Sequence, residues 1–329
     1  MAILSIFYSV AFLPHLLPID PYSKFTQVNL PPGSIGPESV ALDRFNQGPY
    51  VGVLDGTILK YKGPNIGFVF LAYTSRNRTR ELCDVTTDPN LGPICGWPFG
   101  FSFNVVTGFL YVVDVFLGLS KVGTEGGNAT LIANSAGGVP FQFLNGVDVD
   151  QFTGDVYFTD ASQTIDIRNI TSGNYVPDST GRLLKYSPIT GEVKVLAGGF
   201  SLPGGPVISV DRKFVLFAEF SNRRIMKYWL TGNKANTVEV LLYLPGNPIK
   251  IKKAPEPGEF WVAVDIIAQQ PSSVTPLGYK FNSTGGILLI KEFEGQYNNI
   301  RVNVVQEYIG GKLYIGSREA KFVGIYSKW

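Results

Sequence analysis

The chain has 329 residues, of which 45% are hydrophobic and 16% charged, and its net charge is +2. This composition supports a large core and argues against disorder, and the small net charge gives no reason to expect nucleic acid as a partner. The 37 glycines and 22 prolines predict frequent turns and few long helices.

Residues 1–20 begin with an almost wholly apolar run from Ala2 to Leu17 that stops at Pro18. The run is short for a membrane span but typical of a signal-peptide core, so we predict a secretory leader in 1–20 and no stable membrane span. The alternative is a buried first strand. The single histidine of the chain, His15, lies in this segment. A mature chain without histidine would have no Ser-His-Asp catalysis and no His-ligated zinc.

A short apolar strand followed by a partner strand recurs six times in residues 21–329. The six first strands start at Tyr50, Tyr111, Tyr157, Leu216, Trp261 and Tyr314. Units of several strands at a spacing of roughly 45 to 61 residues predict an all-β, six-bladed β-propeller that forms a single domain. The alternating segment Phe25–Leu30 is expected to join the last blade and close the ring, which removes an open sheet edge.

The opening strand of each propeller blade lines the central channel. Residues at the starts of these strands are therefore expected to meet at one mouth of the channel. They are Glu38, Phe99, Asn145, Gly204, Asn247 and Asn303. Asp114, Asp160 and Glu219 end equivalent strands and are expected to cap the loops between blades. A polar insertion at 162–180 interrupts blade three.

Two cysteines and four sequons favour the secretory route. Cys83 and Cys95 lie in a loop rich in Pro, Asp and Gly, where nothing supplies the second pair of ligands that a zinc site needs. A disulfide that closes this short loop is the prediction. The N-x-S/T sequons stand beside turn residues, where a glycan would remain in water, at Asn77, Asn128, Asn169 and Asn282.

Several segments together resemble the strictosidine synthase-like family of plants. They include Lys60–Asn65, Val122–Gly127, Val156–Asp160, Thr180–Tyr186 and Ala218–Phe220, and the resemblance extends over nearly all of the chain after the leader. It implies a six-bladed propeller, a disulfide between the two cysteines, and a route from the endoplasmic reticulum to the vacuole. With the predicted leader, we expect a location in the secretory pathway: the vacuole, the extracellular space or the lumen of the endoplasmic reticulum.

The resemblance does not carry the activity of strictosidine synthase with it. In that enzyme a glutamate near the start of the last blade is the general base of a Pictet–Spengler condensation between tryptamine and secologanin, and this position falls on Asn303. An amide does not take up a proton near neutral pH. The other pocket positions carried over from the family are Arg301 in place of a histidine, Phe99 and Asn145 in place of tyrosines, Phe143 in place of a tryptophan, and Phe220, which stays aromatic. A loop with another pocket histidine is altered near Gln270–Pro271.

The wider superfamily of paraoxonase- and gluconolactonase-type propellers holds calcium in the channel. That resemblance implies Glu38, Asn145 and Asn247 as metal ligands. One carboxylate and two amides would bind a calcium ion weakly. Simpler explanations stay open: Glu38 and Asn145 as turn residues, Asn303 as a bond to a neighbouring blade, and the three phenylalanines as core.

The expected partner is a small, largely apolar molecule bound at the channel mouth of a monomer. The first hypothesis is a family-type hydrolase that acts on an ester or lactone with Glu38 as a catalytic group and calcium as its cofactor. The second is a binding or scaffold protein without catalysis. The third is a Pictet–Spengler enzyme of alkaloid biosynthesis with a relocated base, for which Glu307 or Glu219 is the candidate.

Overall fold

The computed structural model describes residues 19–269, 272–293 and 295–329. Residues 1–18 of the predicted leader and the altered loop at Gln270–Pro271 lie outside the described residues. Within the described ranges, no helix is both long enough and apolar enough to cross a bilayer.

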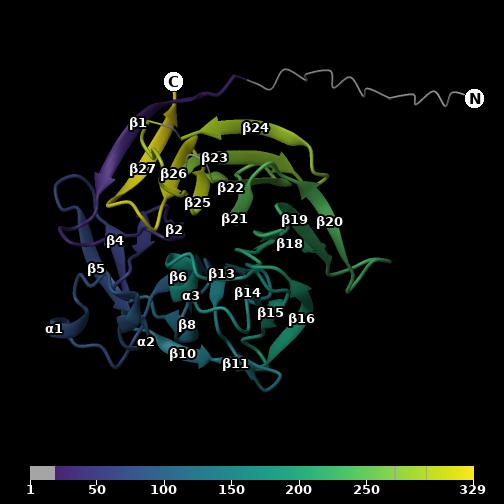
Figure 1. Ribbon diagram of the computed structural model, residues 1–329, viewed down its shortest axis with the longest axis horizontal. Helices are drawn as coiled ribbons and strands as arrows, with labels where there is room; N and C mark the ends of the chain where they lie inside the picture. Colours follow the sequence, from purple (N-terminus) through teal and green to yellow (C-terminus); the bar gives the residue numbers. More distant parts are fainter. Residues whose placement is uncertain (1–18, 270–271, 294) are drawn as a thin grey trace, which may run out of the picture.

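Six antiparallel sheets form the blades of a ring (Figure 1), which confirms the predicted six-bladed propeller. Blade one consists of β2 (Val40–Ala41), β3 (Tyr50–Gly52), β4 (Thr57–Tyr61) and β5 (Phe68–Tyr73). Blade two consists of β6 (Pro98–Phe103), β7 (Leu110–Asp114), β8 (Gly118–Val122) and β10 (Thr130–Ala133). Blade three consists of β13 (Leu144–Val149), β14 (Val156–Asp160), β15 (Gly181–Tyr186) and β16 (Val193–Phe200). Blade four consists of β17 (Val207–Ile208), β18 (Phe214–Glu219), β19 (Arg224–Trp229) and β20 (Val238–Tyr243). Blade five consists of β21 (Asn247–Lys253), β22 (Glu259–Gln269), β23 (Ser272–Asn282) and β24 (Ile287–Glu292). Blade six consists of β25 (Val304–Tyr308), β26 (Lys312–Gly316), β27 (Phe322–Lys328) and β1 (Tyr22–Asn29).

The ring is closed by pairing between the two ends of the described chain. The first strand, β1, runs antiparallel to the last strand, β27, and completes blade six (Figure 1). Phe25 pairs with Tyr326, and their ring centroids are 5.0 Å apart. The alternating segment at 25–30 therefore closes the ring as predicted, although the strand begins three residues earlier, at Tyr22.

The hydrophobic core lies between neighbouring blades. Leu216 and Ala218 of β18, for example, pack in one cluster with Val262 and Val264 of β22. The inner strands are covered on both faces, so β18 is buried along its whole length, and its residues before Glu219 form a continuous apolar run rather than an alternating one.

The remaining short strands and helices lie in the loops of blades one to three. Short strand β9 (Gly127–Asn128) adds to β5 in parallel, and β11 (Ser135–Ala136) pairs with β12 (Val139–Pro140). The cysteine loop holds α1 (Arg80–Cys83), a 3-10 turn at Pro89–Leu91 and α2 (Gly92–Cys95), and the polar insertion of blade three holds α3 (Ile167–Thr171). The predicted disulfide between Cys83 and Cys95 is present and joins α1 to α2.

Candidate functional site

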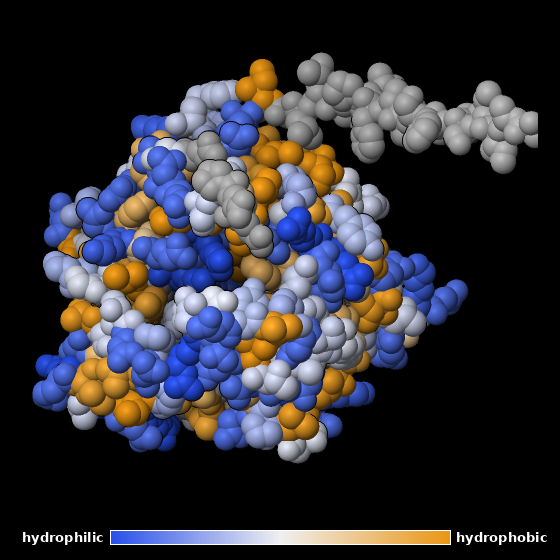
Figure 2. Space-filling view, in the orientation of Figure 1, coloured by the Kyte–Doolittle hydropathy of each residue, from blue (hydrophilic) through white to orange (hydrophobic). Residues whose placement is uncertain are grey.

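A pocket of about 490 Å³, counting the space at its open mouth, lies at one end of the channel. The pocket is lined by Phe99, Phe143, Asn145, Ile167, Ile170, Tyr175, Leu202, Gly204, Phe220, Pro248, Ile249, Arg301, Asn303 and Arg318. Figure 2 shows the middle of this face hollowed, with strongly hydrophilic residues beside apolar ones.

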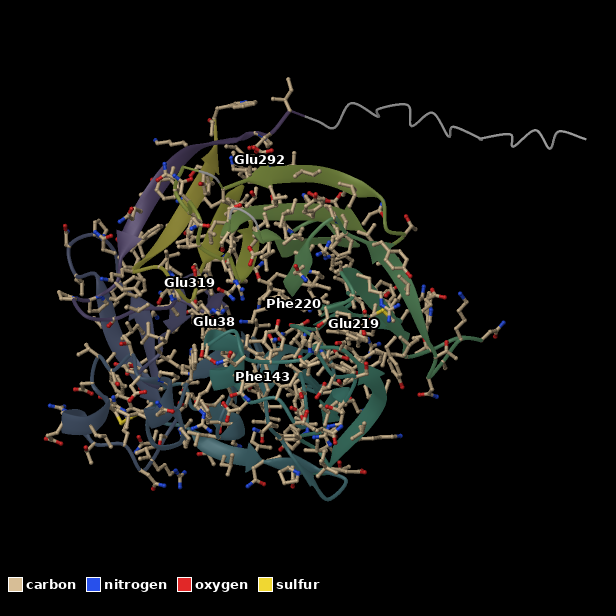
Figure 3. The ribbon with its side chains drawn as sticks, viewed as in Figure 1. Glu38, Phe143, Glu219, Phe220, Glu292 and Glu319 are labelled. Carbon is tan, nitrogen blue, oxygen red and sulfur yellow. A yellow bond between two sulfur atoms is a disulfide. The ribbon has the colours of Figure 1, made fainter. Side chains whose placement is uncertain are left out.

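The structure brings together most of the residues that the sequence placed at one mouth. Phe99, Asn145, Gly204 and Asn303 come from four different blades and line the same pocket. Phe143, Phe220 and Arg301, the other proposed pocket residues, also line it. In Figure 3, Phe143 and Phe220 lie near the middle of the ring.

Carboxylates at the ends of second strands fix the backbone that presents these side chains. Asp160 accepts the backbone N–H of Phe143 at 3.1 Å, Glu219 accepts that of Ser201 at 2.9 Å, and Asp114 accepts that of Trp97 at 2.6 Å. In each case the acceptor ends the second strand of a blade and the donor precedes its first strand. The prediction that these residues cap loops is confirmed, and the loops they cap lead into the pocket.

The walls of the pocket are aromatic and aliphatic. The rings of Phe99 and Phe143 meet edge to face, with centroids 5.4 Å apart. Helix α3 contributes Ile167 and Ile170, which lie on one face of the helix because they are three residues apart. Aromatic and branched aliphatic surfaces of this kind favour a flat or compact apolar ligand.

The polar side chains of the pocket are two amides, two guanidinium groups and the hydroxyl of Tyr175. Asn303 Oδ1 accepts the backbone N–H of Arg318 at 2.8 Å, so it bonds within blade six rather than acting on a proton. Arg301 and Arg318 both line the pocket. Glu319 contacts this pair: its Oε1 lies 3.7 Å from Arg318 Nε, and its Oε2 accepts the backbone N–H of Arg301.

Glu38 does not line the pocket but lies buried behind it, with a side chain that is 0% exposed. Its Oε1 accepts a hydrogen bond from Lys250 Nζ at 2.7 Å. Burial raises the pKa of Glu38 and lowers that of Lys250, because each charged group loses water. The Glu38 side chain therefore neither anchors a turn nor binds a metal ion, two of the expectations from the sequence, because its partner is the ammonium group of Lys250.

The predicted calcium ligands do not fit a calcium ion. Glu38 is neutralised by Lys250, and Asn247 Nδ2 donates to the Phe220 carbonyl at 2.9 Å. Glu38 Oε2 and Asn145 Oδ1 are left without hydrogen-bond partners among the described residues. Even with the amide oxygen of Asn247, whose Nδ2 is the atom engaged, these three side-chain oxygens fall short of the six to eight that calcium takes. Across the described ranges, no cluster of three or more acidic, Cys or His residues is placed to hold a metal.

Neither candidate for a relocated base lines the pocket. Glu307 accepts hydrogen bonds from the Tyr22 hydroxyl at 2.6 Å and from Trp261 Nε1 at 2.9 Å. Glu219 binds Arg224 and the backbone of Ser201. Glu307 joins blade six to blade five through Trp261, and Glu219 stabilises blade four, so the contacts of neither carboxylate direct it toward a ligand.

Sequence reasoning missed about half of the pocket. It did not propose Tyr175, Leu202, Pro248, Ile249 or Arg318. The pair Ile167 and Ile170, just after the N-cap Asp166, is the one local signal in the insertion that could have pointed to a buried helix face. Gly204 has a steric reason, because a Cβ there would collide with the carbonyl oxygen of Ile249 where blades four and five meet.

Three of the four sequons present an exposed asparagine, at Asn77, Asn128 and Asn169. The fourth, Asn282, is half-buried, and its Oδ1 accepts hydrogen bonds from Thr284 and Gly286. Access for a glycan is therefore better at the first three positions.

A buried carboxyl group lies behind the arginines. Asp265 is 0% exposed, and burial raises its pKa to about 7. Its Oδ1 accepts the Val302 N–H at 3.2 Å, while Oδ2 has no hydrogen-bond partner among the described residues. The charges of Arg301 and Arg318 act to lower this pKa but do not overcome desolvation.

Asp265 should make unfolding depend on pH. Because its folded pKa lies above the unfolded value, its contribution to stability is complete below pH 4 and is lost as the pH rises to about 7. Asp265→Asn, which imitates the neutral acid, should match the unchanged protein near pH 4 and be more stable by about 1–3 kcal/mol at pH 8. Urea unfolding at both pH values measures this difference. An equal gap at the two pH values would contradict it.

Comparison with known proteins places the chain in a family. Models described as "Strictosidine synthase-like, N-terminal" and "Strictosidine synthase" match residues 23–61 and 145–233. The chain is 40% identical to strictosidine synthase of Catharanthus roseus over 296 residues, covering 89% of this chain and 83% of the relative. It is 39% identical to strictosidine synthase-like 11 of Arabidopsis thaliana over 303 residues, covering 92% and 91%.

Solved structures with little sequence identity share the fold. A gluconolactonase from Xanthomonas campestris superimposes with a TM-score of 0.62 at 12% identity, covering 94% of this chain and 99% of that one. A calcium-binding regucalcin from Agrobacterium tumefaciens gives 0.60 at 12% identity, covering 94% of each chain. These likenesses concern the propeller alone. The sequence matches decide the family: the chain belongs to the strictosidine synthase-like family.

Proposed function

We propose that this protein binds a small, largely apolar molecule carrying an anionic group at the channel mouth. The observation that carries the proposal is the composition of the pocket. Its walls are aromatic and aliphatic, and its only charged lining groups among the described residues are the guanidinium groups of Arg301 and Arg318. Guanidinium groups bind carboxylates through paired, charge-assisted hydrogen bonds.

The nearby acids do not cancel this preference. The side chain of Glu319 is 38% exposed, so water and salt screen its charge. Asp265 is buried, with its pKa raised to about 7, so it is largely neutral below that pH. An amine cation would instead meet two positive groups and no pocket-lining carboxylate.

Binding without catalysis is the activity that the contacts support best. A hydrolase that used Glu38 would need that carboxylate to reach the ligand, whereas it is buried and paired with Lys250. The family's condensation would need a base at Asn303, whose Oδ1 accepts a backbone N–H. The relocated bases Glu307 and Glu219 point to other partners.

Titration calorimetry with three matched probes tests the ligand class. We expect 4-phenylbutanoate to bind at least about 10-fold more tightly than 4-phenylbutylamine, with 4-phenylbutanol between them, because a hydrogen bond to a charged group contributes about 1.5–3 kcal/mol. Arg301→Gln should remove most of the preference for the anion. Arg80→Gln, on the exposed helix α1, is the control and should leave it unchanged.

Two outcomes would contradict the proposal. One is an amine that binds as tightly as the acid, and the other is turnover of tryptamine and secologanin to the condensed alkaloid. We further propose that the protein follows the secretory route, a proposal supported by the disulfide and by the exposed sequons.

A further inference from the structure

Lys250 is a charged residue in the buried part of a channel strand. It follows Pro248 and Ile249 in β21, and it is 1% exposed. Removing a lone ammonium group from water is very costly, so its partners must compensate. Those partners come from distant parts of the chain, which makes this contact a feature of the assembled ring.

Three oxygens surround the nitrogen of Lys250. Nζ donates to Glu38 Oε1 at 2.7 Å, to the Glu38 carbonyl oxygen at 3.1 Å and to the Phe99 carbonyl oxygen at 2.8 Å. A neutral amine has only two N–H bonds, so three acceptors require the protonated form. The ring of Phe99 adds a cation–π contact, with its centroid 4.4 Å from Nζ.

This oxygen set has the chemistry of a hard-cation site. A carboxylate and two backbone carbonyls are groups that a divalent cation accepts as ligands. Here the ammonium already occupies the space between them, and a second cation beside it would meet like-charge repulsion without a second carboxylate to offset it. Lys250 belongs to blade five, whereas Glu38 and Phe99 precede and begin the channel strands of blades one and two.

We propose that the Lys250 ammonium is a built-in cation that joins blades one, two and five across the channel in place of a metal ion, so that this propeller needs no divalent cation. The contact also fixes the pocket, because Phe99 offers its carbonyl oxygen and its ring to Lys250 while lining the ligand site. The inference concerns the channel and does not depend on which ligand the pocket takes.

Thermal unfolding with and without metal tests the proposal. The unchanged protein should have the same Tm in 1 mM CaCl₂ as in 1 mM EDTA. Lys250→Met leaves the buried carboxylate unpaired and should lower Tm by roughly 5–15 °C in either buffer. Lys252→Met is the matched control, because Lys252 is half-buried on the same strand and forms no ion pair within the described residues. It should not lower Tm, because desolvation lowers the pKa of Lys252 to about 8 and the uncharged Met side chain removes that cost.

The double variant Glu38→Gln/Lys250→Met keeps the test decisive if the single variant fails to fold. It removes both charges and should recover most of the lost Tm. A rise in Tm of the unchanged protein with calcium that disappears in Glu38→Gln would overturn the proposal. So would a Lys250→Met variant as stable as Lys252→Met, because the ammonium would then contribute nothing to the ring.

Discussion

Replacement of Asp160 by alanine is expected to destabilise the propeller by about 3–5 kcal/mol, the usual result of removing one partner from a buried ion pair. Asp160 is 0% exposed at the end of β14, and its Oδ2 lies 2.6 Å from Arg182 Nη2, whose side chain is 6% exposed. The truncation leaves the guanidinium in the protein interior without its carboxylate. It also frees the Phe143 N–H, which Asp160 Oδ1 accepts. Urea unfolding followed by far-ultraviolet circular dichroism measures the loss.

An exposed ion pair provides the control for this experiment. Asp211 and Lys213 are 3.3 Å apart with side chains 50% and 63% exposed, and Asp211→Ala should cost no more than about 0.5 kcal/mol. The double variant Asp160→Asn/Arg182→Met removes both charges and should lie closer to the unchanged protein than Asp160→Ala does. If Asp160→Ala and Asp211→Ala cost the same, the buried pair does not stabilise the fold.

The loss at Asp160 should also reach the pocket. The carboxylate holds the backbone just before β13, and this segment presents Phe143 and Asn145 to the ligand. Asp114 and Glu219 hold the equivalent segments of their own blades through Trp97 and Ser201. The same contact, a strand-end carboxylate that accepts a backbone N–H, therefore holds the segments of several blades that form the walls of the pocket.

These carboxylates show what could be predicted from the sequence. Acidic residues at the ends of second strands recur with the blade repeat, so the period itself suggests one shared role. The mouth residues Phe99, Asn145, Gly204 and Asn303 could be found in the same way, because the start of each channel strand follows from the repeat. Features that recur with the repeat can be predicted because each copy of the unit indicates what the equivalent positions of the other copies do.

The rest of the site could not be predicted because it departs from the repeat. Ile167, Ile170 and Tyr175 lie in the insertion of blade three, which is polar in composition but forms a helix whose apolar face lines the pocket. The residues next to Lys250 in the sequence predict an ordinary lysine on the solvent-facing side of a strand. Its partner Glu38 lies 212 residues away and meets it only in the closed ring. A contact of this kind depends on long-range geometry that no local pattern contains.

Deletion of β1 is expected to abolish the folded monomer. A chain that begins at Pro31 lacks the strand that pairs with β27 from Tyr22 to Asn29. It also lacks the Tyr22 hydroxyl, which donates to the buried Glu307 at 2.6 Å, and the Phe25 ring against Tyr326. The loss exposes the edge of β27 and the apolar face beneath it. Since domains retain only about 5–15 kcal/mol of net stability, we expect unfolding or association through the open edge.

Size-exclusion chromatography and circular dichroism of the chain beginning at Pro31, beside one beginning at Ile19, measure this effect. The longer chain keeps β1 and should elute as a folded monomer. A synthetic peptide spanning 20–30 should restore folded protein to the shorter chain, whereas the same peptide with Phe25→Ser and Tyr22→Ser should not, because it lacks the two aromatic contacts. A stable monomer from the chain that begins at Pro31 would mean that blade six closes the ring with three strands, and that β1 is an addition to a propeller already complete.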